Sequence, residues 1–367
     1  MKKTKAAVLE ATGGSLRLTE LDIEGPKANE VAIRVVACGL CHSDYSCIHG
    51  IVRTPLPVVL GHEAGGIVEE VGPSVSDLEV GDHVIVALTP ACGRCEFCAE
   101  EKPFLCTQMF ATLGSCTMPD GTTRLSNDGG AVHQLCAVGG FAEHAVVPAG
   151  CAVRVDSDLP LETICLIGCG VTTGVGAALN TAGIRPGTTV AVLGCGGVGL
   201  SVVQGARIAG AKTIVAVDPV AAKRELAMAL GATHAVDPRV EDSTRAVRRI
   251  VPGGVHYAFE VIGRAETMAQ AFAMARPSGM AVVVGVTSPS DSVPIRAGGF
   301  QQQKTLIGSA YGSAVPRRDF PRFLELYRKG DLRLEPMITA RIALEDVNEA
   351  LAAMAQGEGV RSVITLA

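Results

Sequence analysis

The pattern of hydrophobic and polar positions changes near residue 170, and its two parts predict different kinds of structure. Up to about residue 160 the apolar stretches are short and are separated by Gly, Pro and Asn turns. This pattern is typical of β-strands in an irregular β-rich domain. Strands are expected there at residues 5–9, 15–21, 31–37, 66–71 and 83–87.

From about residue 171, β-like apolar runs alternate with segments of helical spacing. This alternation predicts a doubly wound parallel sheet covered by helices on both faces, and therefore an α/β chain. The expected strands are 188–193, 213–217, 256–261 and 280–286, and the expected helices are 198–209 and 221–230. The tail returns to a mixed pattern, with helices near 319–329 and 344–354 and a last strand at 360–366.

Composition limits the partners. A chain of 367 residues with 48% hydrophobic residues can bury two cores, and its net charge of −5 gives no general attraction to nucleic acid or anionic membranes. Residues 163–184 and 186–206 carry no charge over about the width of a membrane. Both stretches are interrupted by Gly, Thr and Asn or Gln, so we interpret them as buried strand and loop and expect no membrane span. The 13 Cys without an export signal favour metal ligands and buried thiols in a cytoplasmic protein.

A glycine-rich motif stands between the first strand and the first helix of the second part. It has the form G-x-G-x-x-G and consists of Gly194, Cys195, Gly196, Gly197, Val198 and Gly199. Its glycines allow a tight turn and a close approach of the pyrophosphate to the helix N-terminus. Asp218 ends the next strand, where a carboxylate binds the ribose hydroxyls of NAD. A structural turn followed by a surface Asp is the alternative.

NADP is an alternative coenzyme, because the basic residues Lys223 and Arg224 lie on the next helix. We expect Lys223 to support the adenosine ribose.

Four cysteines lie within fifteen residues, in the pattern C-x2-C-x2-C-x7-C: Cys92, Cys95, Cys98 and Cys106. Four thiolates this close can wrap one tetrahedral Zn²⁺ and leave no open position, which predicts a structural site. Disulfides would be strained at this spacing, and four unrelated buried thiols do not suit such a charged loop.

A second group of potential ligands is dispersed: Cys41, His62 with Glu63, and Cys169. Two thiolates, one imidazole and one open position make a catalytic zinc site of the kind for which alcohol dehydrogenase is the reference example. Spacing alone does not select these residues, since a lone His is usually structural and free Cys is often buried.

Taken together, these motifs resemble the zinc-containing medium-chain dehydrogenase/reductase family, specifically the alcohol dehydrogenases. The resemblance covers essentially the whole chain and includes 39–44, 61–63, the four-Cys segment, 168–174, 194–199, Asp218 and 359–361. It implies a GroES-like catalytic domain at 1–170 and 311–367, a Rossmann domain at 171–310, and an active site in the cleft between them. It also implies two zinc ions per chain, NAD, and a small alcohol or aldehyde as substrate.

The resemblance implies a role for individual residues. Cys41, His62 and Cys169 would bind the catalytic zinc, with Glu63 behind it as a transient ligand, and Ser43 would take the proton of the alcohol. The coenzyme would contact His42, Thr173, Val198, Val284, Val286 and Arg361, besides the glycines, Asp218 and Lys223. Ser43, Leu88, Phe141 and Val286 would line the substrate pocket.

One position departs from the family. Many members have a His five residues after the first zinc Cys, where this chain has Ser46. His49 could replace it, but we expect a proton relay through Ser43, the ribose hydroxyl and water.

Three functional alternatives remain. Residues 118–124 resemble the loop of thiol-adduct formaldehyde dehydrogenases, but 49–53 lack the acidic residue expected for glutathione. We therefore favour an apolar, aromatic or terpenoid alcohol. Residues 171–176 also resemble nicotinoproteins that keep NAD bound, and a catalytically silent NAD-binding protein would hold one zinc rather than two. The resemblance suggests a homodimer or a tetramer joined near 305–308.

Overall fold

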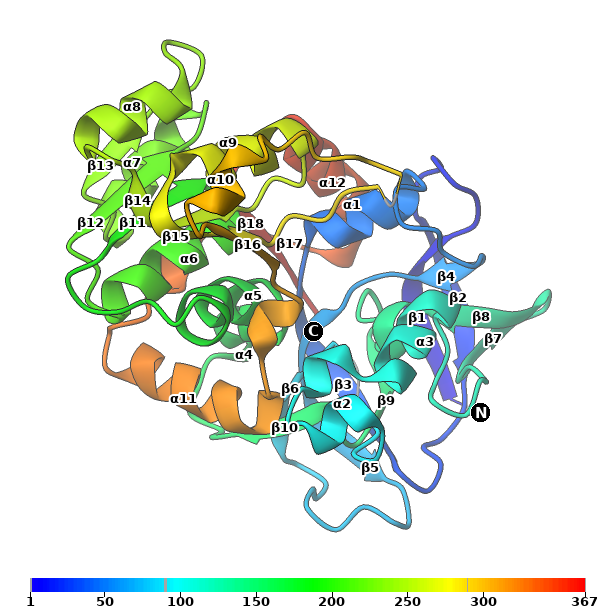
Figure 1. Cartoon of the computed structure of the whole chain (residues 1–367). Helices are drawn as coiled ribbons and strands as arrows, with labels where there is room; N and C mark the ends of the chain where they lie inside the picture. Colours follow the sequence, from blue (N-terminus) through cyan, green and yellow to red (C-terminus); the bar gives the residue numbers. More distant parts are fainter. Residues whose placement is uncertain (1, 89–90, 289, 367) are drawn as a thin grey trace. The chain divides into compact units, whose positions relative to one another are not determined.

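The structure is a computed structural model that describes residues 2–88, 91–288 and 290–366 (Figure 1). The chain forms two compact units. The first unit consists of Met1–Cys169, Val315–Leu324 and Ile338–Ala367, and the second of Gly170–Ala314 and Glu325–Met337.

Strands dominate the first unit, as the short apolar stretches predict. One group of strands closes into a barrel in the order β1-β2-β7-β8-β4, and another forms a sheet in the order β10-β6-β5-β3-β18-β17, with β9 also paired to β3. These strands are β1 (Lys2–Leu9), β2 (Arg17–Ile23), β3 (Glu30–Gly39), β4 (Val58–Val59), β5 (Glu63–Val71), β6 (His83–Val86), β7 (Leu125–Asn127), β8 (Gly130–Gln134), β9 (His144–Pro148), β10 (Ala152–Val155), β17 (Ile338–Ile342) and β18 (Arg361–Thr365).

Helices of the first unit are short and lie in its connections. They are α1 (His42–Ile48), α2 (Glu96–Ala99), α3 (Thr107–Ser115), α4 (Leu161–Ile164) and α12 (Val347–Ala355). The C-terminal segment is part of this unit because β18 pairs with β3, and Asn348 exchanges two hydrogen bonds of 2.9 Å with the backbone of Leu16. Apolar side chains of both the barrel and the sheet fill one core.

Strand β3 organises this unit. It pairs with β5, β9 and β18, so it is surrounded by partners and mostly buried. Pairing on both sides of β3 aligns Gly39 with Glu63 on β5 and with Val363 on β18. Residues from three distant parts of the sequence thereby meet at one end of the sheet.

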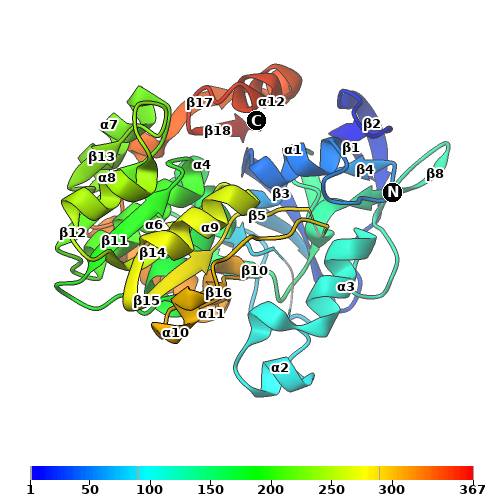
Figure 2. The same cartoon turned by 45° about the horizontal axis from the view of Figure 1, so that its top comes forward.

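The second unit is a parallel sheet in the order β13-β12-β11-β14-β15-β16. Strands β12 and β13 are added on one side of β11, and β14 to β16 on the other side. Its strands are β11 (Thr189–Leu193), β12 (Thr213–Val217), β13 (His234–Val236), β14 (Val255–Glu260), β15 (Ala275–Val283) and β16 (Thr305–Gly308). Both views draw β11, β12 and β14 side by side (Figures 1 and 2). The predicted α/β class with a doubly wound sheet is confirmed.

The helices that connect these strands cover the sheet. They are α5 (Gly170–Gly176), α6 (Gly197–Ile208), α7 (Ala221–Leu230), α8 (Ser243–Ile250), α9 (Ala265–Met274) and α10 (Gly298–Gln301); α11 (Pro316–Arg328) runs from the first unit into the second. Buried residues of β11, β12, β14 and α9 form a common core. Residues 280–286 were predicted as a strand, but β15 begins at Ala275 and ends at Val283. The prediction began too late because Pro277 and Gly279 have the sequence pattern of a turn.

Among the described residues, no single helix is long and apolar enough to cross a membrane. One bent pair, Leu161–Gly168 with Gly170–Thr181, meets the criterion by length and composition only.

Candidate metal centres and dinucleotide site

The dispersed group of potential ligands comes together in the first unit. Cys41 immediately precedes α1, His62 and Glu63 stand at the start of β5, and Cys169 is the last residue before the second unit. One ligand atom of each lies within 4.8 Å of those of the others, and all four side chains are buried. Two sulfurs, one imidazole nitrogen and a carboxylate at this spacing fit a zinc ion.

The two sulfurs of this group influence each other. Contact with Cys169 lowers the pKa of the Cys41 thiol well below its usual range, and the same contact raises the pKa of Cys169. The thiolate is the form that binds metal. The pair is therefore poised to supply one thiolate directly and to lose its second proton when a cation binds.

Asp44 holds two of the ligands in place. Its Oδ2 accepts a hydrogen bond from the backbone N–H of Cys41 at 3.0 Å, and its Oδ1 lies 3.3 Å from Nδ1 of His62. Oδ1 also accepts from the N–H of Gly61 at 3.0 Å. A carboxylate on Nδ1 fixes the ring and leaves Nε2 as the nitrogen that would bind a metal. Asp44 was not expected from the sequence to have a role, although its place three residues after Cys41 was the available signal.

A buried ion pair includes one of these potential ligands. Glu63 pairs with Arg361 of β18, and both side chains are almost completely buried. Burial opposes the charge of Arg361, but the Glu63 carboxylate and the Cys41 and Cys169 sulfurs together outweigh it and raise the pKa of the guanidinium. A Cβ at Gly39 would overlap the Glu63 carboxylate, so glycine is needed there. Among the described residues, Nε of Arg361 is buried without a hydrogen-bond partner, which leaves a donor for an anion.

Residues around Cys41 occupy different environments on α1. The Ser43 hydroxyl is 3.6 Å from the Cys41 sulfur and is partly exposed, and His42 is exposed. Ser46, at the position where many family members have the relay His, is buried, whereas His49 is exposed and packs against Tyr45 with the rings tilted and their centroids 4.1 Å apart. The relay through Ser43 and water stays a prediction.

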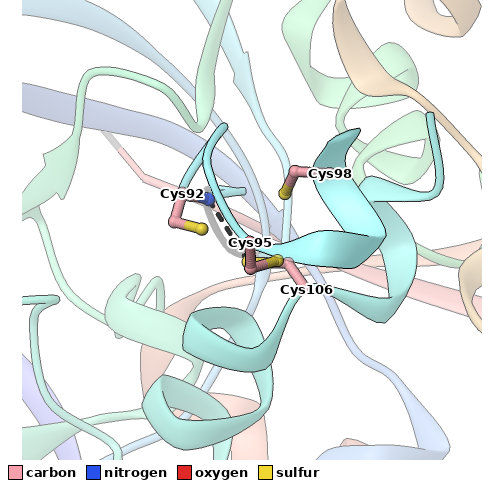
Figure 3. Close-up of side chains that lie close together, drawn as sticks. All are labelled: Cys92, Cys95, Cys98 and Cys106. Carbon is pink, nitrogen blue, oxygen red and sulfur yellow. Dashed lines mark hydrogen bonds between the residues drawn. The ribbon is translucent and has the colours of Figure 1, made fainter. Parts of the chain in front are cut away.

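The four-cysteine lobe (Cys92, Cys95, Cys98 and Cys106) lies in the segment that contains α2 and leads into α3 (Figure 3). The four sulfurs all lie within 4.8 Å of one another, which suits a tetrahedral zinc with metal–sulfur bonds of about 2.3 Å. The sulfur of Cys106 accepts the backbone N–H of Cys92 at 3.2 Å. Backbone N–H groups of Cys98 and Thr107 lower the pKa of Cys95 to about 6, which favours its thiolate. All 13 Cys of the chain are free thiols in this structure.

In the second unit the glycine motif follows β11 and begins α6. Gly194 has φ +98°, a conformation that favours glycine, and a Cβ at Gly199 would overlap the carbonyl of Gly194. Gly196 differs, because its backbone is extended and a Cβ there would meet no atom within 4 Å. The protein itself does not require glycine at this position. The space that a Cβ of Gly196 would occupy is free and can accommodate a pyrophosphate; we call this space the cradle.

Asp218 follows β12 and is buried beside this motif. Its carboxylate accepts the backbone N–H of Cys195 at 2.7 Å and that of Val220 at 2.8 Å. Each oxygen keeps a lone pair for a ribose hydroxyl. Lys223 is half-buried on α7. Arg224 is engaged with Asp237 at 3.1 Å and with the carbonyl of Asp218 at 2.7 Å.

The remaining predicted contacts divide between the two units. In the second unit, Thr173 on α5 and Val198 on α6 are brought close because Gly174 packs directly on the Val198 backbone; Val284 is half-buried and Val286 is exposed. In the first unit, Leu88 is partly buried, and Phe141 is fully buried against the Gly61 position. Phe141 therefore presents no surface to solvent, and its place in a substrate pocket stays a prediction.

Comparisons with known proteins agree with this geometry. Residues 27–157 match the alcohol dehydrogenase GroES-like domain, and residues 197–329 match the zinc-binding dehydrogenase family. The chain is 39% identical over 366 residues to the NDMA-dependent alcohol dehydrogenase of Amycolatopsis methanolica, covering 99% of this chain and 98% of the relative. It is also 39% identical to the S-(hydroxymethyl)glutathione dehydrogenase of a Synechocystis strain, covering 99% of each. Among solved structures, benzyl alcohol dehydrogenase from Acinetobacter calcoaceticus superposes with a TM-score of 0.95 at 32% identity and covers 100% of both chains.

Proposed function

Because the chain belongs to the zinc-dependent alcohol dehydrogenases of the medium-chain dehydrogenase/reductase family, we propose that it transfers hydride reversibly between an apolar primary or secondary alcohol and NAD. The observation that carries this proposal is the complete set of buried ligands, Cys41, His62 and Cys169, oriented by Asp44. A zinc ion held there supplies Lewis-acid catalysis, which lowers the pKa of a bound hydroxyl. A catalytically silent protein on this fold would not need such a set.

The chain's own residues account for the other steps. Ser43, beside the Cys41 sulfur, accepts the proton of the alcohol hydroxyl and passes its own proton on through the ribose hydroxyl to water. The backbone of the glycine motif holds the pyrophosphate, and Asp218 accepts both ribose hydroxyls. Arg361 offers its unpaired Nε to the pyrophosphate. His42, Thr173, Val198, Val284 and Val286 complete the coenzyme contacts, and Lys223 supports the adenosine ribose.

An apolar or aromatic alcohol is the proposed substrate class, with Leu88 and Phe141 lining the pocket. The likeness to benzyl alcohol dehydrogenase supports it. The test is a screen of aromatic, terpenoid and short alcohols with NAD and with NADP, followed by NADH absorbance, alongside metal analysis. Two zinc ions per chain and turnover of an apolar alcohol with NAD are expected. One zinc ion and no turnover of any alcohol would refute the proposal in favour of a silent protein.

A thiol-adduct formaldehyde dehydrogenase is the second candidate, favoured by the identity to S-(hydroxymethyl)glutathione dehydrogenases. The charged side chains of residues 118–124 are already paired, which argues against a direct role of this segment in binding the thiol adduct. Arg124 is buried, and it binds Glu30 and Asp120. Asp120 also pairs with Lys27 at 2.9 Å. Formaldehyde oxidation that requires added glutathione or mycothiol would establish this candidate.

A nicotinoprotein that retains its NAD is the third candidate, favoured by the identity to the NDMA-dependent enzyme. Denaturing the purified protein and measuring released NADH separates it from the main proposal. Stoichiometric release from protein purified without added coenzyme would establish it.

Gly196 provides a test of the coenzyme site that does not disturb the fold. Gly196→Ala should leave the melting temperature unchanged, because the new Cβ meets no protein atom. It should raise the Kd for NADH at least about tenfold, equivalent to about 1.4 kcal/mol, because the methyl group enters the space of the pyrophosphate. Fluorescence titration with NADH measures the change.

Two other glycines of this unit are the controls for that test. The Cβ of Gly298→Ala would also meet no protein atom, so this variant should change neither the melting temperature nor the Kd for NADH. Gly199→Ala should destabilise the unit, because its Cβ would overlap the carbonyl of Gly194. NADH binding to Gly196→Ala with the wild-type Kd would show that the cradle does not hold the pyrophosphate.

Asp218 tests the choice between NAD and NADP. Asp218→Asn removes the charge that accepts the ribose hydroxyls, and hydrogen bonds to charged groups contribute about 1.5–3 kcal/mol. The kcat/KM for NAD should fall about 10- to 100-fold, and that for NADP should fall less or rise. Steady-state kinetics with both coenzymes measure the ratio. Glu241→Gln, which removes a carboxylate of the same unit that pairs with Arg249 at 2.7 Å, is the control that should keep this ratio. An unchanged ratio in Asp218→Asn would remove Asp218 from coenzyme selection.

We further propose a cytoplasmic homodimer, with a tetramer as the alternative. Support comes from β16, which is the edge strand of the parallel sheet and carries the exposed Ile307. Light scattering coupled to gel filtration distinguishes monomer, dimer and tetramer.

A further inference from the structure

Strand β14 ends in a carboxylate that no step above uses. Glu260 is fully buried, and its Oε1 accepts hydrogen bonds from the backbone N–H groups of Ile262 at 2.9 Å and Gly263 at 2.8 Å. The Thr267 hydroxyl donates to the same oxygen at 2.8 Å. Among the described residues, Oε2 has no hydrogen-bond partner. A buried carboxylate oxygen without a partner is unfavourable, so stability alone does not explain the choice of Glu here.

The turn that Glu260 holds lies against the glycine motif. Leu193, which precedes Gly194, pairs in register with Glu260, and its carbonyl accepts the N–H of Val261 at 3.1 Å. A Cβ at Gly194 would lie 2.8 Å from Ile262 and 3.2 Å from Val261, and a Cβ at Gly199 would lie 3.0 Å from Val261. Residues 261–264 are therefore in close contact with the loop that begins α6.

The same turn also supports the segment after β15. The backbone carbonyl of Glu260 accepts the N–H of Val284 at 2.8 Å and that of Gly285 at 3.1 Å. A Cβ at Gly263 would overlap the carbonyl of Val286, and a Cβ at Gly285 would overlap the nitrogen of Gly263. Backbone contacts this close transmit any displacement of the turn to Val284 and Val286.

We infer that Glu260 is a positioning residue for the dinucleotide: it fixes the turn 261–264, against which both the pyrophosphate loop 194–199 and the segment 284–286 rest. This inference depends on the proposed coenzyme site. Glu260 itself does not contact the coenzyme. It acts through Ile262 and Gly263, because its Oε1 accepts hydrogen bonds from the backbone N–H groups of both residues.

The test compares Glu260→Ala with Glu260→Gln in the full-length protein loaded with zinc. Glu260→Ala should raise the Kd for NADH and the KM for NAD at least tenfold with two zinc ions still bound, and hydrogen exchange at the amides of Ile262 and Gly263 should accelerate. Glu260→Gln should bind NADH within about twofold of wild type, because its amide oxygen can accept the same three donors. If Glu260→Ala does not fold, Glu260→Asp replaces it, since the shorter side chain withdraws the carboxylate and should also weaken NADH binding.

Asp242→Ala is the matched control, because Asp242 caps α8 in the same unit by accepting the N–H of Arg245 at 2.8 Å. It should lower the melting temperature and leave the Kd for NADH unchanged. An unchanged Kd in Glu260→Ala, or an equal rise in Asp242→Ala, would overturn the positioning role. If the wild-type protein bound neither NADH nor NADPH, the proposed function itself would fail, and this inference with it.

Discussion

Cys41→Ser is expected to lower kcat/KM by at least about 10³-fold and to reduce the zinc content from two ions per chain to one. The reason is that the serine hydroxyl stays protonated at neutral pH and is a poor replacement for a thiolate ligand. Loss of the ion removes Lewis-acid stabilisation of several kcal/mol at the hydroxyl of the substrate; each 1.36 kcal/mol corresponds to a factor of ten in rate. Metal analysis and steady-state alcohol oxidation measure both changes.

Cys165→Ser is the matched control for this prediction. Cys165 is an equally buried thiol in the same unit, and its sulfur points to the carbonyl of Glu162 rather than into the ligand group. The variant should keep two zinc ions and most of its activity. Turnover and full zinc content in Cys41→Ser would refute the assignment of the catalytic metal centre, whatever the substrate proves to be.

Loss of the second metal should act on stability rather than on chemistry. Cys98→Ser is expected to release the zinc of the four-cysteine lobe and to unfold residues 91–116. Helices α2 and α3 contain 4 and 9 residues, which is too short for either to be stable alone. Structural zinc contributes about 10–16 kcal/mol to the folding of small zinc domains, so a loss of several kcal/mol is expected here. The melting temperature should fall by at least about 5 °C.

Limited proteolysis locates this effect, since cleavage should appear within residues 91–116. NADH binding should survive, because the glycine motif belongs to the other unit. Cys116→Ser, which changes a buried thiol just after α3, is the control that should retain the zinc. Two zinc ions and an unchanged melting temperature in Cys98→Ser would disprove the structural role of the lobe.

Local sequence signals predicted the parts of the sites that are close together in the chain. The four cysteines are so near in sequence that closing their loops costs little entropy, and spacing alone indicates a shared metal. The glycine motif, the strand before it and Asp218 similarly form one strand–helix–strand unit, whose geometry follows from chain connectivity. In contrast, the start of β15 was missed because Pro277 and Gly279 indicated a turn. The pairing with β14 is irregular at these residues, since it passes from Ala275 directly to Met280, but the strand continues across the irregularity.

The sequence by itself determined the α/β class, the change of architecture near residue 170 and the two local motifs, because periodicity and short spacing are properties of neighbouring residues. Only the tertiary structure brought Cys41, His62 and Cys169 together, and only it showed Asp44 behind them and Arg361 paired with Glu63. These contacts depend on β3 pairing with both β5 and β18, and on Gly39 leaving room between them. Strand pairing joins residues that are far apart in the chain, so no local pattern records it. For the same reason the position of the buried Glu260 carboxylate, where the ends of β11, β14 and β15 meet, could be recognised only in the tertiary structure.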